Sequence, residues 1–213
     1  LSVGLVAGAI SGGLVAWLKV PSFLVTLGML GLLVGVARWI TASAPIPIAD
    51  QTYIAIFGGG QLGSVPTIFI WVTLVVGIGA IVMNKTKFGR HVRATGGNLV
   101  AAGYTGVKTA RVKFIVLMLS GGGAALAGML YAGRLQSGRF QWGTGDELSV
   151  IAAVILGGTS LFGGRGQVIG SLFGAVFIGL INNGLILMGL DVSQQQVVRG
   201  AIIILAVALS RKK

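Results

Sequence analysis

The sequence predicts an all-α fold, a polytopic transmembrane helical bundle with about seven membrane segments, one of them short or broken. Three observations lead to this class. Of the 213 residues, 54% are hydrophobic and only 9% are charged, whereas a soluble domain carries about 25% charged residues. Apolar runs long enough to cross a bilayer, for which about 20 residues are needed, recur along the chain. Seven of the 16 Lys and Arg residues gather in one mostly polar stretch, residues 85–113, between two such runs.

The apolar runs define the expected helices in chain order. They cover residues 1–18, 23–42, 67–84, 114–133, 148–162, 167–189 and 197–210. Backbone polar groups find no water in the bilayer core, so each run that spans it should be helical. The run 148–162 is short and ends in Gly157-Gly158-Thr159-Ser160, which predicts a broken or tilted helix. The final run is also short.

Basic residues set the expected orientation of these helices. Cationic loops between spans are retained on the cytoplasmic side, so residues 85–113 are placed inside. Alternation then places segments 43–66 and 134–147 outside, and the C-terminal Arg211-Lys212-Lys213 inside. Orientation alone accounts for a net charge of +12, so nucleic acid is not expected as a partner. We expect one transmembrane domain over residues 1–213.

Small residues at helical spacing predict where helices approach closely. Three sets recur every four residues, namely Gly4, Gly8 and Gly12; Gly166, Gly170 and Gly174; and Ser120, Ala124, Gly128 and Ala132. Residues four apart share one helix face, and small ones let two backbones meet. We expect most of these residues to serve tight packing within the bundle.

The chemistry-bearing residues give no support for catalysis. His91 is the only histidine and there is no cysteine, so we expect neither a catalytic set nor a metal site. Asn182 and Asn183 lie within the apolar run 167–189, where a polar side chain needs a partner or a water-filled cavity. From the residues alone, cavity lining and hydrogen bonding between helices both remain open for them.

Two stretches of sequence resemble a known family. They read FGRHVRATGGNLVAAGYTGV (88–107) and GTGDELSVIAAVILGGTSLFGGRGQVIGSLFGAVFIGLINNGL (143–185). Over residues 67–210 the chain closely resembles the permease subunit of bacterial ATP-binding-cassette sugar importers, of the ribose, xylose and galactoside type. That group belongs to the branched-chain amino-acid/sugar permease superfamily. Its members are longer and this chain begins at Leu1, so the resemblance implies an N-terminally truncated copy.

The resemblance implies partners and a location. It implies a multi-pass protein of the bacterial cytoplasmic (inner) membrane, in contact with membrane lipid and with its C-terminus in the cytoplasm. The permease would pair with a second permease copy or homologue, a cytoplasmic ATP-binding-cassette ATPase dimer and an extracytoplasmic sugar-binding protein. No cofactor is expected on this chain, since ATP and Mg would be bound by the partner ATPase.

The resemblance also implies roles for particular residues. Residues expected to couple the permease to the ATPase, through a short helix, are Gly97, Asn98, Leu99, Val100, Ala101, Ala102, Tyr104 and Gly106. Residues expected along the substrate path are Gly157, Gly158, Thr159, Asn182 and Asn183. Glu147 is expected either to dock the binding protein or to cap the helix that follows it.

Three alternatives accompany this hypothesis. The first is a branched-chain amino-acid permease of the same superfamily, which would transport a different class of solute with the same kind of ATP-driven importer. A secondary transporter would usually carry carboxylates within its spans, whereas all four acidic residues here lie in or beside predicted outer segments. A membrane enzyme or scaffold is the third alternative, and no cluster of catalytic groups supports the enzyme.

Overall fold

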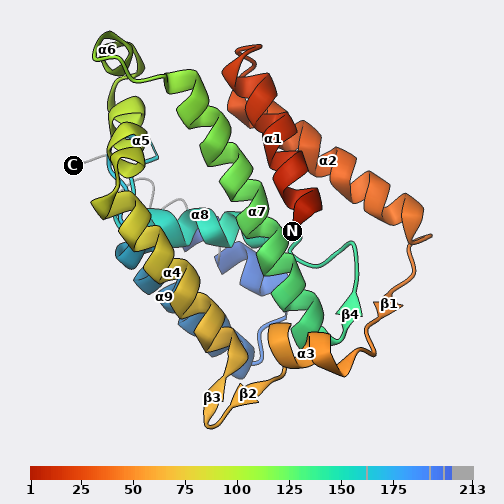
Figure 1. Cartoon of the computed structure of the whole chain (residues 1–213). Coiled ribbons are helices and arrows are strands. Elements are labelled where there is room, and N and C mark those ends of the chain that lie inside the picture. The colour runs from red at the N-terminus through yellow and green to blue at the C-terminus, as the bar shows by residue number, and fades with distance from the viewer. Residues whose placement is uncertain (162, 192, 199, 203–213) are drawn as a thin grey trace. The chain divides into compact units, whose positions relative to one another are not determined.

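The computed structural model describes residues 1–161, 163–191, 193–198 and 200–202 (Figure 1). This part of the chain is mainly helical. Its helices are α1 (Ser2–Ala16), α2 (Ser22–Ile40), α3 (Gln51–Phe57), α4 (Thr67–Lys85), α5 (Lys87–Gly97), α6 (Leu99–Tyr104), α7 (Thr109–Leu135), α8 (Asp146–Leu156) and α9 (Val168–Leu187). Its strands are β1 (Ile46–Pro47), β2 (Gln61–Leu62), β3 (Val65–Pro66) and β4 (Ser137–Gly138). The all-α prediction is confirmed.

Four of these helices, α2, α4, α7 and α9, are long and apolar enough to cross a membrane by length and composition. Helix α1 is apolar but has 15 residues, and α8 has 11. Helix α8 ends just before Gly157, so the break predicted at the end of run 148–162 is confirmed. Most of the predicted run 197–210 lies outside the described residues. The total of about seven segments therefore stays a prediction.

The chain divides into two compact units. The first contains residues 1–75 and 106–142, and the second contains residues 76–105 and 143–213. Each is described here by itself. Both carry large apolar side chains on their outer surfaces, for example Phe69 on α4 and Phe173 on α9. Such surfaces suit helices whose solvent is lipid.

The first unit is held together by α1 against α7, which lie side by side in Figure 1. The glycines of α1 face the α7 backbone with no side chain between them. A Cβ atom on Gly8 would lie 2.6 Å from the Leu117 carbonyl oxygen, and one on Gly12 would lie 2.8 Å from that of Phe114. A Cβ atom on Gly4 would overlap both the Ala125 Cβ and the Gly121 carbonyl oxygen. The packing role predicted for these three glycines is confirmed.

The small-residue set predicted on α7 does not make this contact. Ser120, Ala124 and Gly128 are exposed, and a Cβ on Gly128 would meet nothing within 4 Å. The face that α7 turns toward α1 begins at Phe114 and passes through Gly121. Adjacent residues on a helix point about 100° apart, so a face one residue away is a different side of the helix. A packing role for Gly128 therefore stays a prediction.

The two predicted outer segments contain regular structure. Strand β1 of segment 43–66 pairs antiparallel with β4 of segment 134–147, with Ile46 opposite Gly138. Strands β2 and β3 form a second antiparallel pair. Helix α3 is capped by Asp50, whose carboxylate accepts a hydrogen bond from the Thr52 N–H at 2.9 Å. All of these contacts lie within the first unit.

The second unit is built on α8 against α9. Gly170 of α9 meets the backbone at Gly157, and Gly174 meets the Ala153 carbonyl. A cluster of buried residues, Ala152, Ala153 and Ile178, lies at this crossing. In the predicted set Gly166, Gly170 and Gly174, the last two pack as expected. A Cβ on Gly166 would touch only the end of the Met83 side chain, at 3.7 Å.

Candidate functional site

The predicted coupling segment folds as two short helices rather than as a loop. A single residue, Thr86, separates the end of α4 at Lys85 from the start of α5 at Lys87. The Thr86 hydroxyl oxygen accepts a hydrogen bond from the Gly89 N–H at 3.2 Å and donates one to the Val82 carbonyl at 2.6 Å. Hydroxyl caps of this kind satisfy the free N–H groups at a helix start. Helix α5 is therefore anchored at the end of a membrane-length helix.

Helix α5 has one inner and one outer face. Gly89 and Thr95 are buried, whereas the basic Lys87 and Arg90 are exposed together with His91. Arg93 is half-buried, and its guanidinium donates a hydrogen bond to the Met83 carbonyl in the last turn of α4. A cation at a helix C-terminus satisfies free carbonyls and suits the helix dipole. Arg93 thus fastens α5 to α4, while Arg90 stays available to a partner.

Helix α6 is the short helix expected in the coupling segment. Asn98 caps it, because its side-chain oxygen accepts hydrogen bonds from the N–H groups of Val100 and Ala101, both at 3.0 Å. Ala102 is buried at 4% exposure. The large side chains point outward, with Tyr104 88% and Val100 64% exposed. A six-residue helix thus presents an uncovered apolar surface in a polar, basic segment.

The glycine-rich turn after α8 has a defined geometry. Gly158 is left-handed, with φ at +86°, and its N–H donates to the Ile155 carbonyl at 2.9 Å. The Thr159 N–H donates to the Val154 carbonyl at 3.1 Å. This pair of bonds is the Schellman arrangement that commonly ends a helix, and it requires a residue that tolerates positive φ. The chain then reverses toward α9.

Thr159 joins this turn to the start of α9. Its hydroxyl oxygen accepts a hydrogen bond from the Gln167 N–H at 3.1 Å and lies 3.4 Å from the Ser171 hydroxyl. The Ser171 hydroxyl also donates to the Gln167 carbonyl at 2.9 Å. Thr159 is therefore engaged in holding the turn closed. Its predicted place on the substrate path stays a prediction.

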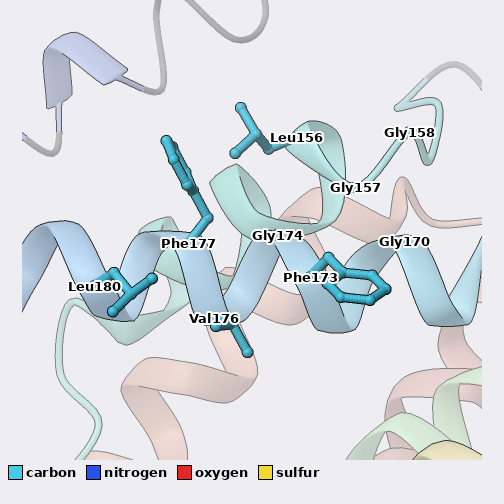
Figure 2. Close-up of a pocket in the computed structure, with 9 residues that line it drawn as sticks. All are labelled: Leu156, Gly157, Gly158, Gly170, Phe173, Gly174, Val176, Phe177 and Leu180. Carbon is cyan, nitrogen blue, oxygen red and sulfur yellow. The ribbon is translucent and has the colours of Figure 1, made fainter.

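An open apolar cavity of about 570 Å³ lies where the end of α8 meets α9 (Figure 2). It is lined by Leu156, Gly157, Gly158, Gly170, Phe173, Gly174, Val176, Phe177 and Leu180. Two of the predicted path residues, Gly157 and Gly158, are among them, but Thr159, Asn182 and Asn183 are not. No lining side chain can donate or accept a hydrogen bond. A solute rich in hydroxyl groups would find few partners in this cavity.

The two asparagines and Glu147 lie apart from that cavity. On α9, Asn182 is half-buried and Asn183 is exposed. Glu147 is exposed in the first turn of α8, and its carboxylate accepts a hydrogen bond from the Gly145 N–H at 2.9 Å. A carboxylate in a first turn also suits the helix dipole. The position of Glu147 fits the dipole effect expected of it, while helix capping and docking of a binding protein both stay predictions.

The structure brings together two stretches that sequence reasoning treated separately. The end of α5, at Gly96 and Gly97, lies against Gly163 and Gly164 of the turn that leads into α9. The only sequence signal for this contact was the presence of two Gly-Gly pairs. The fastening of Arg93 to Met83 had no signal beyond a basic residue near a helix end.

Comparisons with known proteins agree with the resemblance seen in the sequence. The chain is 43% identical over 189 residues to the probable ABC transporter permease protein YphD of Escherichia coli (strain K12), covering 89% of this chain and 57% of that protein. It is 39% identical over 217 residues to the ribose import permease protein RbsC of the same organism, covering 100% of this chain and 67% of RbsC.

A third relative broadens the set. The chain is 38% identical over 211 residues to the autoinducer 2 import system permease protein LsrC of Salmonella paratyphi B (strain ATCC BAA-1250 / SPB7), covering 96% of this chain and 58% of LsrC. The chain thus spans between 57% and 67% of the length of these three relatives. No solved structure shows a significant match. The family described as "Branched-chain amino acid transport system / permease component" matches residues 1–207, and the chain belongs to that family.

Proposed function

We propose that this chain forms the membrane-spanning path of an ATP-driven importer for a simple sugar, with ATP hydrolysed on a partner subunit. The observation that carries the proposal is its similarity, at 39% to 43% identity, to two permease proteins over most of its length. One of them is named as a ribose import permease. The protein would lie in the bacterial inner membrane as a multi-pass subunit with its C-terminus in the cytoplasm.

The geometry of α6 supports a cytoplasmic partner. Its exposed apolar side chains, Leu99, Val100 and Tyr104, stand on a capped helix beside the basic face of α5. An exposed apolar patch rimmed by charge is typical of a protein contact. We assign this surface to a groove on the partner ATPase, of which two copies would serve two permease subunits.

The solute class follows from the relatives and from the chemistry of the candidate path. A sugar presents hydroxyl groups without net charge, and amide side chains such as those of Asn182 and Asn183 can both donate to and accept from them. Asn183 is exposed on a helix of membrane length, where an asparagine facing lipid would be costly. We therefore place Asn183 toward a water-filled path and assign the apolar cavity to lipid or protein contact.

A branched-chain amino acid is the second candidate solute, because the family description names it. The two candidates make different demands on the path. An amino acid carries an ammonium and a carboxylate group, which require charged or dipolar partners. A sugar requires only neutral hydrogen-bonding groups.

Solute-stimulated ATPase activity tests the proposal. The permease is reconstituted in proteoliposomes with the ATPase and the binding protein encoded beside it, and is assayed with pentoses, hexoses and branched-chain amino acids. We expect stimulation by one sugar together with its uptake. Stimulation by an amino acid alone would move the chain to the second candidate. Lack of stimulation by any solute in a fully assembled complex would overturn the importer proposal.

The docking surface has its own test. Tyr104→Asp places a charge in the apolar contact, so ATPase binding and uptake should both fall while the permease remains in the membrane. Gln61→Asp adds the same charge at an exposed site in a predicted outer segment and should leave both unchanged. Normal uptake in the Tyr104→Asp protein would exclude α6 as the docking helix.

A further inference from the structure

Two backbones meet directly at the end of α5. A Cβ atom on Gly96 would lie 3.0 Å from the Gly164 nitrogen and 3.6 Å from the Gly163 Cα. From the other side, a Cβ on Gly164 would lie 3.2 Å from the Gly97 Cα, and one on Gly163 would overlap the Gly96 carbonyl. No side chain stands between the two segments. All four positions carry glycine, which is the residue that allows this approach.

The turn side of this contact is shaped for it. Gly163 and Gly164 have φ values of +92° and +78°, so other residues would be strained there. The turn is closed by the Ser160 N–H, which donates to the Arg165 carbonyl at 3.0 Å. The same turn continues from Thr159, which is bonded to the start of α9. A displacement of the turn would therefore reach both the end of α8 and the start of α9.

The α5 side is equally constrained. Arg93 holds α5 to the Met83 carbonyl, and Gly89 lies so close to that carbonyl that a Cβ would overlap it. Thr95, next to the contact, is only 9% exposed. Asn98 follows at once and caps α6. Helix α5 is thus held against the end of α4, and its own C-terminal end carries both the glycine contact and the start of α6.

We propose that the contact of Gly96 and Gly97 with Gly163 and Gly164 is the rigid junction that carries movement of α6 to the α8–α9 turn. This inference rests on the proposed function, since it gives the docking helix a mechanical route to the candidate path. Backbone that contacts backbone has no rotatable side chain between the two segments that could absorb a displacement. The four glycines act as positioning residues and do not touch the solute.

The first test enlarges one side of the junction. Gly96→Val pushes the Gly164 backbone away, so movement of α5 should reach the turn less completely. We expect the number of solute molecules imported per ATP hydrolysed to fall roughly 2- to 30-fold, the usual range for substitutions within a coupling network. A purely structural loss would reduce the assembled complex, lowering transport and hydrolysis in proportion and leaving this ratio unchanged.

Ala94→Val is the matched control for that variant. Ala94 lies on the same helix two residues earlier, is exposed and already carries a Cβ, so valine there enlarges a side chain that is not part of the four-glycine contact. Valine forms helix less well than alanine, so the control carries the larger propensity penalty. We expect its ratio to stay at the wild-type value. If Gly96→Val and Ala94→Val import the same number of solute molecules per ATP hydrolysed, the proposed role of the junction is overturned.

The second test asks whether the two segments move as one body. These 213 residues contain no cysteine, so Gly97→Cys combined with Gly164→Cys introduces the only thiols within them. The added Cβ atoms would lie 3.7 Å and 3.2 Å from the opposite Cα atoms, so the two thiols are within reach of each other. Each single-cysteine variant serves as a control for oxidation of partner subunits.

The outcomes separate this inference from the proposed function. We expect the disulfide to form in the membrane, and the oxidised protein to transport within about 2-fold of its own reduced form, because a rigid junction tolerates locking. Because Gly164 has a positive φ, the Gly164→Cys single variant must first reach wild-type amounts in the membrane; failure of the bond to form in that background would remove the contact. Arrest of transport on oxidation, reversed by dithiothreitol, would show that the segments must separate and would overturn the junction. Absence of solute-stimulated hydrolysis in the wild type would refute the importer instead, while disulfide formation in membranes would still test the contact.

Discussion

The stability of helix α6 depends on one N-terminal cap, the side chain of Asn98. Helix α6 has six residues, and helices of that length are marginal without outside support. Asn98 supplies two bonds at 3.0 Å to otherwise free N–H groups. Asn98→Ala removes both and touches none of the exposed apolar side chains. Loss of such a cap costs about 1 kcal/mol, which corresponds to about a 5-fold smaller ratio of folded to frayed helix.

Two measurements report this change. The Ala102 N–H donates to the Asn98 carbonyl at 3.0 Å and the Thr105 N–H to the Ala101 carbonyl at 3.2 Å. In hydrogen-exchange mass spectrometry, a peptide covering residues 98–106 should exchange about 5-fold faster in the Asn98→Ala protein. If the ATPase binds only the folded helix, its dissociation constant should rise by no more than the same factor.

Asn98→Ser is the matched control, because serine caps helices about as well as asparagine and is also neutral. We expect it to restore both slow exchange and ATPase affinity. Wild-type exchange in the Asn98→Ala protein would refute the capping argument. Equal damage from Ser and Ala would show that the asparagine acts by direct contact with the partner rather than by ordering α6.

Three further predictions follow from the packing and the polar groups. Gly8→Val should lower the unfolding temperature in detergent, because its Cβ would lie 2.6 Å from an α7 carbonyl oxygen, and the free energy of unfolding should fall by about 1 to 3 kcal/mol. The control Gly28→Val should leave the unfolding temperature unchanged, because a Cβ there meets nothing within 4 Å. Asn183→Leu should reduce sugar uptake or alter sugar preference, and unchanged kinetics would return Asn183 to a packing role. Thr95→Val should leave the unfolding temperature unchanged or raise it, because the buried Thr95 hydroxyl has no hydrogen-bond partner among the described residues, whereas Thr86→Val should lower it by loss of a cap. A lower temperature for Thr95→Val than for Thr86→Val would contradict this.

The sequence alone predicted the long helices closely. The run 67–84 corresponds to α4 at Thr67–Lys85, and the run 167–189 to α9 at Val168–Leu187. The break before Gly157 followed from Gly157 and Gly158, since two glycines favour the end of a helix. The exposed short helix at 99–104 was expected only from the family resemblance. The helix of residues 87–97 was missed, because the stretch was judged by its charge rather than by its pattern.

The remaining features depend on residues far apart in the chain. Pairing of β1 with β4 joins Ile46 to Gly138, and nothing in either dipeptide specifies the other. The regular spacing of small residues marked both Gly8, which meets the α7 backbone, and Gly128, which meets nothing within 4 Å, because spacing identifies a face and not its partner. The family resemblance predicts a place on the substrate path for Thr159. Only the tertiary structure shows that its hydroxyl contacts Gln167 and Ser171 and so closes the turn.

The sequence by itself determined which segments are helical and suited to lipid. In a bilayer each helix must satisfy its own backbone hydrogen bonds, so this information is local and survives in the composition and length of each apolar run. Only the tertiary structure decided which glycines meet, at Gly8 with α7 and at Gly96 with Gly163. Contacts between backbones depend on how two helices or turns cross in space, and the crossing is fixed jointly by segments that are distant in the sequence.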